Sequence, residues 1–559
     1  MPGRYLELKP VRSTFWGEVS RLALVIGLEQ RVLTLIVSYA LAIALFSLVV
    51  PLTVQELVST FAFSIEPVMI VTLTLIILIG LLFIGFFRVF QTSATEILFQ
   101  RLYTRIAIAM TEHLPRVREE VFVPSYANYF GEAELLPRAV VVVLVDLINV
   151  VISGAAGMVM LVVYHPYFLV YNAFLLGGFA LVQFTSGQGG VRATQTVSQH
   201  HYDLMTWMQD IAQNRLHFKA TQSAPLLLNK TDRLLESYLA ARRARSGVLT
   251  WRQYISTVIW EAICHSGMIG MGGWLLSIGQ ITLGQFVAAE VIVGTLLLNL
   301  DTVTRRIYAV TYILTSFDEL TRVFSLPKDD LREEASFARL PDPAIHGLRV
   351  TCKDAGFAYP NSPPIIEGFN LEVAPGEKVA VISHTSTGKS TLALLLAGLS
   401  RPTTGVVRFN DVDLRDMTMD DINAARALVL DSHLTLFGGT LEENISLGRP
   451  SVRFEDFRWA LKFAELDEEA DRLPQGLETP TLAGGKLFTK SQILRILVAR
   501  AIVTRPQLLV FDGTLHNMEP DLRQILLRRL CSKEETWSVI FVTNDPSIGE
   551  YVDRRVMLG

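Results

Sequence analysis

The residues most able to do chemistry lie at 379–399, where VAVISHTSTGKSTLALLLAGL places a polar loop between two apolar runs. This order predicts a strand, a phosphate-binding loop and a helix that begins near Lys389. In such a loop, backbone N–H groups and the helix N-terminus surround phosphates, the lysine contacts the β- and γ-phosphates, and the next hydroxyl binds Mg²⁺. We therefore expect ATP and Mg²⁺ as cofactors, with Ser390 as a metal ligand. The loop residues expected to contact the nucleotide are Thr385, Ser386, Thr387, Gly388, Lys389, Ser390 and Thr391.

The loop departs from the phosphate-binding pattern G-x-x-x-x-G-K-[ST] at its first position, where Ser383 replaces glycine. Glycine lets the backbone take positive φ and approach a phosphate closely, so a serine there weakens or reshapes the loop. The strand before the loop and the helix after it support nucleotide binding. The alternative interpretation is an ordinary strand–helix turn.

The elements that must position this loop belong to residues 346–559. From about residue 347, short β-rich runs alternate with helical ones, as in LRVTCKDAGFAY, FNLEVA and EKVAVIS. That alternation predicts an α/β domain with a mainly parallel sheet. Residues 325–345 are polar and contain prolines, which is typical of a linker, and residues 1–324 differ in character from both.

Composition indicates that residues 1–324 lie in a membrane. Of the 559 residues, 50% are hydrophobic and only 19% are charged, whereas about 25% charge is typical of soluble proteins. The net charge of −4 indicates no particular partner, and we expect no nucleic acid. The three cysteines match no zinc or redox spacing, and packed thiols are the preferred interpretation.

Apolar stretches, each near the roughly 20 residues needed to cross a bilayer, predict six transmembrane helices. They lie at about 33–54, 67–90, 139–163, 167–187, 255–277 and 283–300. Lysine and arginine are concentrated in the N-terminal segment and in 91–138 and 188–254, and the three intervening connections carry none. The positive-inside rule then predicts cytosolic termini and two cytosolic excursions, 91–136 and 190–252, which continue the membrane helices.

Ionisable side chains interrupt these stretches at Asp146, Glu261, His265 and Glu290. Because an ionisable group at bilayer depth costs at least about 2.5 kcal/mol, each should face a cavity or a partner group. Glu261 and His265 are spaced i, i+4 and lie on one helix face. One interpretation is a substrate-binding or proton-responsive site in a central cavity. The preferred interpretation is a structural pair between helices.

The order of these features resembles the exporter-type ABC transporters over nearly the whole chain. Phe357-Ala358-Tyr359-Pro360 is similar to the loop whose aromatic ring stacks on adenine, which implies that Tyr359 binds the nucleotide. FGGTLEENISLG at 437–448 resembles the segment after the family's glutamine loop, and QLLVFD at 507–512 resembles the strand that ends in the magnesium ligand, Asp512. The domains that the resemblance implies are an all-α six-helix transmembrane domain at 1–324, a linker at 325–345 and an α/β P-loop nucleotide-binding domain at 346–559.

Against the family pattern, this chain lacks the residues that drive ATP hydrolysis. The glutamate that acts as general base should follow Asp512, where Gly513 stands, and Asn544 replaces the switch histidine. Ser432 replaces the glutamine that senses the γ-phosphate, and Ser386 replaces the second loop glycine. We therefore expect no catalytic residue and little or no intrinsic hydrolysis. The family's LSGGQ signature aligns with Phe488, Thr489, Lys490, Ser491 and Gln492, which keep only the final residue.

The resemblance implies a dimer in which each ATP lies between the phosphate loop of one half and the signature of the other. Since this chain departs in its base, its signature and its D-loop (His516-Asn517-Met518-Glu519), both composite sites are impaired in a homodimer or a heterodimer. The preferred hypothesis is a degenerate subunit of a bacterial inner membrane that binds ATP and supports export of an unknown substrate with a partner half, in a heterodimer or larger membrane complex. The alternatives are a pseudo-transporter that acts as a structural or regulatory scaffold, and a working homodimeric exporter with unusual catalytic groups.

Overall fold

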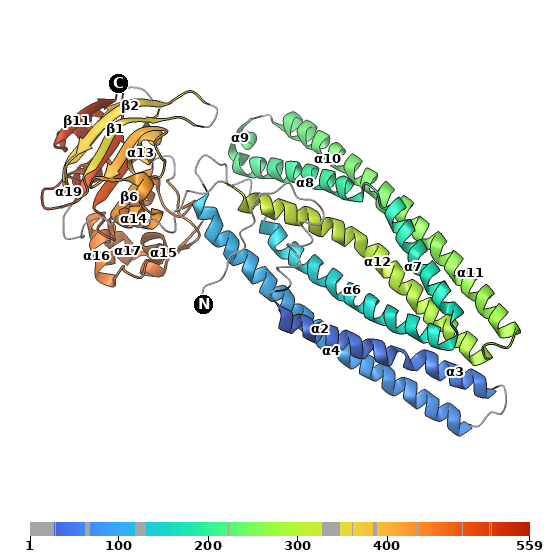
Figure 1. The fold of residues 1–559 in the computed structure, drawn as a ribbon. Helices are drawn as coiled ribbons and strands as arrows, with labels where there is room; N and C mark the ends of the chain where they lie inside the picture. Colours follow the sequence, from blue (N-terminus) through green and yellow to red (C-terminus); the bar gives the residue numbers. More distant parts are fainter. Residues whose placement is uncertain are drawn as a thin grey trace. The chain divides into compact units, whose positions relative to one another are not determined.

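The computed structural model divides the chain into two compact units, Met1–Pro327 and Lys328–Gly559 (Figure 1). Each unit is described by itself. The boundary between them falls inside the segment expected to be a linker, most of which lies outside the described residues. The described residues are 27, 29–61, 67–117, 130–221, 223–326, 347–359, 362–383, 388–430, 434–482, 484–513, 515 and 517–558.

The first unit consists of long helices, as its apolar runs and scarce helix breakers predict. The longest, α4, has 47 residues. At about 1.5 Å per residue it is about 70 Å long, more than twice the roughly 30 Å of a hydrocarbon core, so it extends well beyond the bilayer. The helices are α2 (Gln30–Ser47), α3 (Val49–Phe61), α4 (Pro67–His113), η1 (Leu114–Arg116), α6 (Phe130–Tyr164), α7 (Tyr167–Ser186), α8 (Gly190–Gln213), α9 (Arg215–Ala220), α10 (Ala224–Ser246), η2 (Gly247–Tyr254), α11 (Ile255–Ser277) and α12 (Leu283–Phe324).

Five helical segments of the described chain are long and apolar enough to cross a membrane. Side chains such as Val71 and Leu82 on α4 are 68% and 65% exposed, as expected of a surface that faces lipid. The fifth predicted stretch, 255–277, forms the 23-residue helix α11 but is not among the five, because Glu261 and His265 lower its hydropathy. The sixth span and the cytosolic position of both termini stay predictions. The five segments are Gln30–Thr60, Pro67–Arg116, Gly131–Tyr164, Tyr167–Ser186 and Leu283–Phe324.

Two apolar clusters hold the helices of the first unit together. In one, Phe168 and Leu175 of α7 pack with Met268 of α11 and with the first half of α12. In the other, Ile36 of α2 and Leu98 of α4 pack with α6 and the second half of α12. The long helix α12 therefore contributes to both clusters, and Figure 1 shows it running alongside α6.

The second unit is built on two large β-sheets and a short two-stranded one, β7-β8, which confirms the α/β fold. Its five-stranded sheet has the order β11-β3-β10-β9-β6 and all its pairings are parallel. The central strands β3, β9 and β10 are buried along their whole length, as expected for a parallel sheet covered on both faces. A four-stranded sheet has the order β2-β1-β4-β5, and its pairings are antiparallel. The strands are β1 (Val350–Phe357), β2 (Ile366–Val373), β3 (Lys378–Ser383), β4 (Thr404–Phe409), β5 (Val412–Asp413), β6 (Arg426–Leu430), β7 (Gly439–Thr440), β8 (Pro480–Thr481), β9 (Leu508–Asp512), β10 (Ser538–Thr543) and β11 (Arg554–Leu558).

Helices cover the sheets, and the strand ends define the edge at which a ligand would bind. In the parallel register Leu430 and Val542 lie beside Asp512, and Leu558 lies beside Ser383. The carboxyl ends of the parallel strands therefore meet at one edge, where open α/β sheets bind ligands. The helices are α13 (Lys389–Leu396), η3 (Leu414–Asp416), α14 (Met419–Ala425), α15 (Leu441–Ser446), α16 (Phe454–Phe463), α17 (Asp467–Arg472), η5 (Gly476–Glu478), α18 (Lys490–Ile502), α19 (Pro520–Leu530) and η6 (Pro546–Glu550).

Candidate nucleotide-binding site

The residues predicted to bind phosphate follow β3 and continue into the start of α13. Gly388 precedes α13 with φ of 81°, and a Cβ added there would lie 2.9 Å from Cγ2 of Ile365. This position needs glycine for two reasons, the left-handed backbone and the close neighbour. Lys389 opens the helix, and Ser390, in its first turn, is exposed. Thr385, Ser386 and Thr387 lie outside the described residues.

Tyr359, the expected adenine contact, lies beside the first turn of α13. Its hydroxyl is 3.4 Å from Oγ1 of Thr391, and its ring meets the Phe357 ring edge-on with centroids 5.1 Å apart. Tyr359 is half-buried, so part of the ring is accessible to a ligand. The structure thus brings together an aromatic ring and the start of the helix that the sequence expected to bind phosphate. Pro360 lies outside the described residues.

Asp512, Gly513 and Asn544 lie at the carboxyl edge of the parallel sheet. Asp512 is 3% exposed at the end of β9, and Asn544 follows β10 and is exposed. Gly513 has φ of 58°, and its N–H donates to the carbonyl oxygen of Val542 at 2.6 Å. A Cβ at Gly513 would meet no atom within 4 Å. The backbone conformation, rather than lack of space, is what opposes a larger side chain here.

The donor set fits a nucleotide with Mg²⁺. The described residues contain no group of three or more His, Cys, Asp or Glu side chains that could hold a metal alone. Mg²⁺ commonly takes one or two protein ligands and completes its shell with water and phosphate oxygens. Ser390 and Asp512 are the residues that would hold it, and its chemistry there would be to neutralise phosphate charge. Lys389 and the amides of the first turn of α13 would hold the phosphates.

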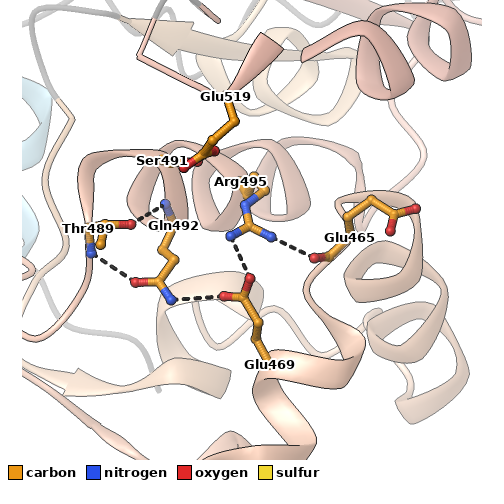
Figure 2. A network of polar contacts seen from close by, with 7 residues as sticks. All are labelled: Glu465, Glu469, Thr489, Ser491, Gln492, Arg495 and Glu519. Carbon is orange, nitrogen blue, oxygen red and sulfur yellow. Dashed lines mark hydrogen bonds and ion pairs between the residues drawn. The ribbon is translucent and has the colours of Figure 1, made fainter. Parts of the chain in front are cut away.

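The segment aligned with the signature begins α18 with a reciprocal cap. Thr489 Oγ1 accepts from the backbone N–H of Gln492 at 3.2 Å, and the N–H of Thr489 donates to Oε1 of Gln492 at 2.8 Å (Figure 2). This capping box satisfies two backbone donors at the helix start. Lys490 is exposed and Phe488 is half-buried against the core of the unit.

The side-chain amide of Gln492 is also occupied within the chain. Its Nε2 donates to Oε2 of Glu469 on α17 at 2.8 Å, and Oε1 of the same carboxylate accepts from Arg495 at 2.7 Å. Arg495 is 4% exposed and donates further to the carbonyl oxygen of Glu465 at 2.6 Å. Figure 2 shows that Glu469 lies between the two donors of α18. Gln492 therefore stabilises a contact between α17 and α18.

Ser491 connects the signature segment to the segment aligned with the D-loop. Its hydroxyl donates to Oε2 of Glu519 at 2.6 Å, and this hydrogen bond holds the pKa of Glu519 below its usual range. Glu519 directly precedes α19. The start of α18 and the start of α19 are thus joined by one charge-assisted hydrogen bond.

Sequence reasoning missed the partners of this network, Glu465, Glu469 and Arg495. A usable signal exists for part of it, because Gln492 and Arg495 are spaced i, i+3 and share a helix face that meets the acidic run of α17. A second missed contact involves Arg500, whose Nε donates to the carbonyl oxygen of Asn444 at 2.6 Å. Burial lowers the pKa of Arg500 to about 10.

In the first unit, the structure pairs His265 with Glu290. Nε2 of His265 lies 3.2 Å from Oε1 of Glu290, so the contact joins α11 to α12. Oε1 of Glu261 is buried and has no hydrogen-bond partner among the described residues. Asp146 forms an ion pair with Arg306. The predicted polar site therefore consists of an interhelical pair and a separate carboxylate, Glu261.

A unit of membrane-length helices followed by a unit with a phosphate-loop site defines a nucleotide-binding membrane protein. Residues 366–516 match the family model described as ABC transporter. A solved structure of a bacterial Atm1-family ABC exporter with ATP bound is similar to this chain with a TM-score of 0.83 and 18% identity, covering 95% of this chain and 93% of the other. The chain accordingly has the architecture of an ABC exporter half, a helical membrane domain fused to an ABC nucleotide-binding domain.

Curated relatives share part of their length with this chain. A multidrug efflux ATP-binding/permease protein of Mycobacterium bovis is 31% identical over 258 residues, which is 45% of this chain and 20% of that protein. The alpha-hemolysin translocation ATP-binding protein HlyB of Escherichia coli is 25% identical, over 61% of this chain and 47% of its own. The ABC transporter ATP-binding protein YwjA of Bacillus subtilis is 23% identical, over 66% and 59%. The matched region is thus less than two thirds of each of these relatives.

Proposed function

We propose that the chain is a catalytically degenerate subunit of an ABC exporter, which binds ATP with Mg²⁺ but hydrolyses it poorly and supports export together with a partner half. The observation that carries this proposal is Gly513, which directly follows the buried Asp512 at the carboxyl end of β9. A general base must reach the attacking water with a side-chain atom within about 2.6–3.2 Å. Gly513 has no such atom.

ATP binding is supported by the parts of the site that remain. Gly388 precedes α13 with a left-handed backbone, Lys389 opens that helix, and Tyr359 presents a half-buried ring beside Thr391. Asp512 ends β9 at the same edge of the sheet at which β3 ends. These residues would bind and orient a nucleotide, with Asp512 occupied as the metal ligand.

The partner is proposed to be a second ABC half, in a heterodimer or a larger membrane complex. In the family arrangement each ATP also contacts the signature of the opposite half. The signature segment that this chain would present to its partner has the sequence FTKSQ. Lys490 and Ser491 replace small glycines and add bulk where that contact would form. An intact partner would therefore still face an altered signature, and turnover of the complex would be low at both sites.

A second candidate is a pseudo-transporter that serves as a membrane scaffold. The observation that favours it is the engagement of Ser491 with Glu519 and of Gln492 with Glu469 inside the same chain. Side chains that are held this way contribute to the stability of the unit whether or not a nucleotide is present. Under this candidate, assembly with the partner is independent of ATP.

The experiment that separates the two candidates uses the full-length chain purified with its native partner. Binding of an azido-ATP photolabel, phosphate release and co-purification of the partner are measured for the native chain, for Lys389→Ala and for Lys353→Ala. Lys353 lies on β1 with an exposed side chain and serves as the matched control.

The proposal predicts labelling that Lys389→Ala abolishes and Lys353→Ala preserves, with phosphate release near background for this chain's own site. Absence of labelling in the native chain, together with normal partner assembly in Lys389→Ala, supports the scaffold. Rapid phosphate release from the chain without an intact partner contradicts both candidates.

A further inference from the structure

A cavity of about 410 Å³ lies in the first unit, where α10, η2 and α12 meet. Arg242 and Arg245 of α10 and Arg305 of α12 contribute to its wall. None of the described residues that line it is acidic. Its volume is in the range of small-ligand sites, about 300–1000 Å³, and its charge selects for an anionic ligand.

The cavity lies where a polar helix becomes an apolar one. The chain reads RRARS at 242–246 and ISTVIW at 255–260, and η2 connects the two. Trp251 on η2 is 70% exposed, and Tyr254 lines the cavity. Tryptophan and tyrosine are enriched at membrane–water interfaces, and arginine heads extend toward that level. This end of the cavity therefore lies at the depth of lipid headgroups.

Side-chain hydrogen bonds hold the inner wall of the cavity in place. Gln253 of η2 is 2% exposed and its Nε2 donates to Oε1 of Gln183 on α7 at 2.6 Å. Nε2 of Gln183 donates to Oγ1 of Thr304 on α12 at 2.9 Å. Arg252 Nε donates to the carbonyl oxygen of Ser186 at the end of α7 at 2.7 Å. These contacts fix η2, a π-helical turn of the kind often found at functional sites, against its neighbours.

Arg242 and Arg305 are oriented by neighbouring side chains. Arg242 Nη1 donates to the Tyr238 hydroxyl at 2.9 Å, and Arg305 Nη2 lies 3.3 Å from the Tyr254 hydroxyl. Arg305 also pairs with Asp301 at 2.8 Å. The partner of Arg242 is thus neutral, and its guanidinium keeps its charge for a ligand. Guanidinium groups match phosphate oxygens in a two-pronged geometry.

We propose that this cavity binds the phosphodiester headgroup of an anionic membrane lipid, with Arg242 and Arg245 as the principal contacts. Basic pockets between membrane helices at the interface are suited to such headgroups. The acyl chains would extend from the interface along α11, where Ile259 and Ile263 are 57% and 48% exposed. The site lies in the membrane unit and requires neither ATP binding nor hydrolysis.

Native mass spectrometry of the delipidated full-length chain tests this proposal. The protein is titrated with phosphatidylglycerol, with phosphatidylcholine and with the water-soluble sn-glycerol 3-phosphate. The variants are Arg242→Gln/Arg245→Gln and a matched pair on the same helix, Arg233→Gln/Arg243→Gln, which removes equal charge from exposed residues that do not line the cavity. Thr250→Phe fills the cavity and changes no charge.

The expected result is about thirtyfold weaker phosphatidylglycerol binding in Arg242→Gln/Arg245→Gln, since each interfacial arginine contributes roughly 1 kcal/mol. Thr250→Phe weakens binding at least fivefold, and the matched pair changes it less than twofold. Phosphatidylcholine binding is unaffected by all three. Equal weakening by the matched pair overturns the proposal, as does displacement of the lipid by glycerol 3-phosphate at similar concentration. If the arginine variant fails to fold, unchanged binding in Thr250→Phe is sufficient to refute the site.

Discussion

The hydroxyl of Ser491 donates a hydrogen bond of 2.6 Å to the carboxylate of Glu519. This bond joins the first turn of α18 to the residue before α19. These are the two segments that the sequence comparison with the family pattern aligned with the signature and the D-loop. Glu519 is exposed, so the hydrogen bond adds only modestly to the stability of the unit. It nevertheless joins the start of α18 to the start of α19.

Ser491→Ala should lower the stability of the chain slightly and in a pH-dependent way. The hydrogen bond depresses the pKa of Glu519 in the folded state. Its contribution is therefore fully present above the unfolded glutamate pKa of about 4.3 and is lost as pH falls through the lower folded-state pKa. We expect the free energy of unfolding to fall by less than about 1 kcal/mol at pH 7, because Glu519 is exposed. Thermal unfolding at about pH 7 and about pH 3 measures this loss. Equal losses at both pH values contradict the charge-assisted bond.

Glu469→Ala should destabilise the second unit strongly. Arg495 is 4% exposed and loses its ion-pair partner. The buried cation then keeps, among the described residues, its hydrogen bond to the Glu465 carbonyl oxygen. We expect the free energy of unfolding to fall by about 2–3 kcal/mol and the apparent melting temperature of the full chain to fall by about 5–10 °C.

The matched control for Glu469→Ala is Glu468→Ala on the same helix. Glu468 pairs with Arg472 at 2.8 Å, but both side chains are more than three quarters exposed. Loss of this surface ion pair should lower the free energy of unfolding by less than about 0.5 kcal/mol. Similar melting temperatures for the two variants would show that the pair made by the buried Arg495 contributes no more than a surface pair.

Gly513→Glu should not restore rapid ATP hydrolysis. The backbone at Gly513 has φ of 58°, and a glutamate there costs about 1–2 kcal/mol or moves the segment out of place. Phosphate release should stay within about threefold of the native chain, and the melting temperature should fall. Gly513→Asn is the control, because asparagine tolerates left-handed backbone and should preserve stability. A tenfold rise in phosphate release with Gly513→Glu would identify the missing side chain as the sole defect.

Tyr359 should contribute to nucleotide affinity through its ring rather than its hydroxyl. Tyr359→Phe loses only the 3.4 Å contact with Thr391, so we expect less than a threefold change in the dissociation constant for ATP. Tyr359→Ala removes a stacking surface that is worth about 1–3 kcal/mol for a base, which corresponds to a dissociation constant raised roughly fivefold to 150-fold. Equilibrium binding of a fluorescent ATP analogue measures both. Equal effects of the two variants would place the base elsewhere.

The helices and strands, and the residues at the phosphate loop, were predictable because their signals are local. An apolar strand, a polar loop and GKST at 388–391 determine β3, the turn at Gly388 and α13 through neighbouring residues alone. Membrane-length apolar runs likewise determine long helices. Even so, local charge made α11 ambiguous, since Glu261 and His265 dilute a run that nevertheless forms a 23-residue helix.

The sequence by itself determined that a membrane unit precedes an α/β unit, and that Gly513, Asn544 and the FTKSQ segment depart from the family pattern. Tertiary structure alone decided that His265 meets Glu290, that Gln492 and Arg495 share the Glu469 carboxylate, and that two arginines of α10 face a cavity with Arg305. Each of these contacts joins different elements. Their formation depends on how helices pack and rotate against one another, and no spacing within one segment encodes that.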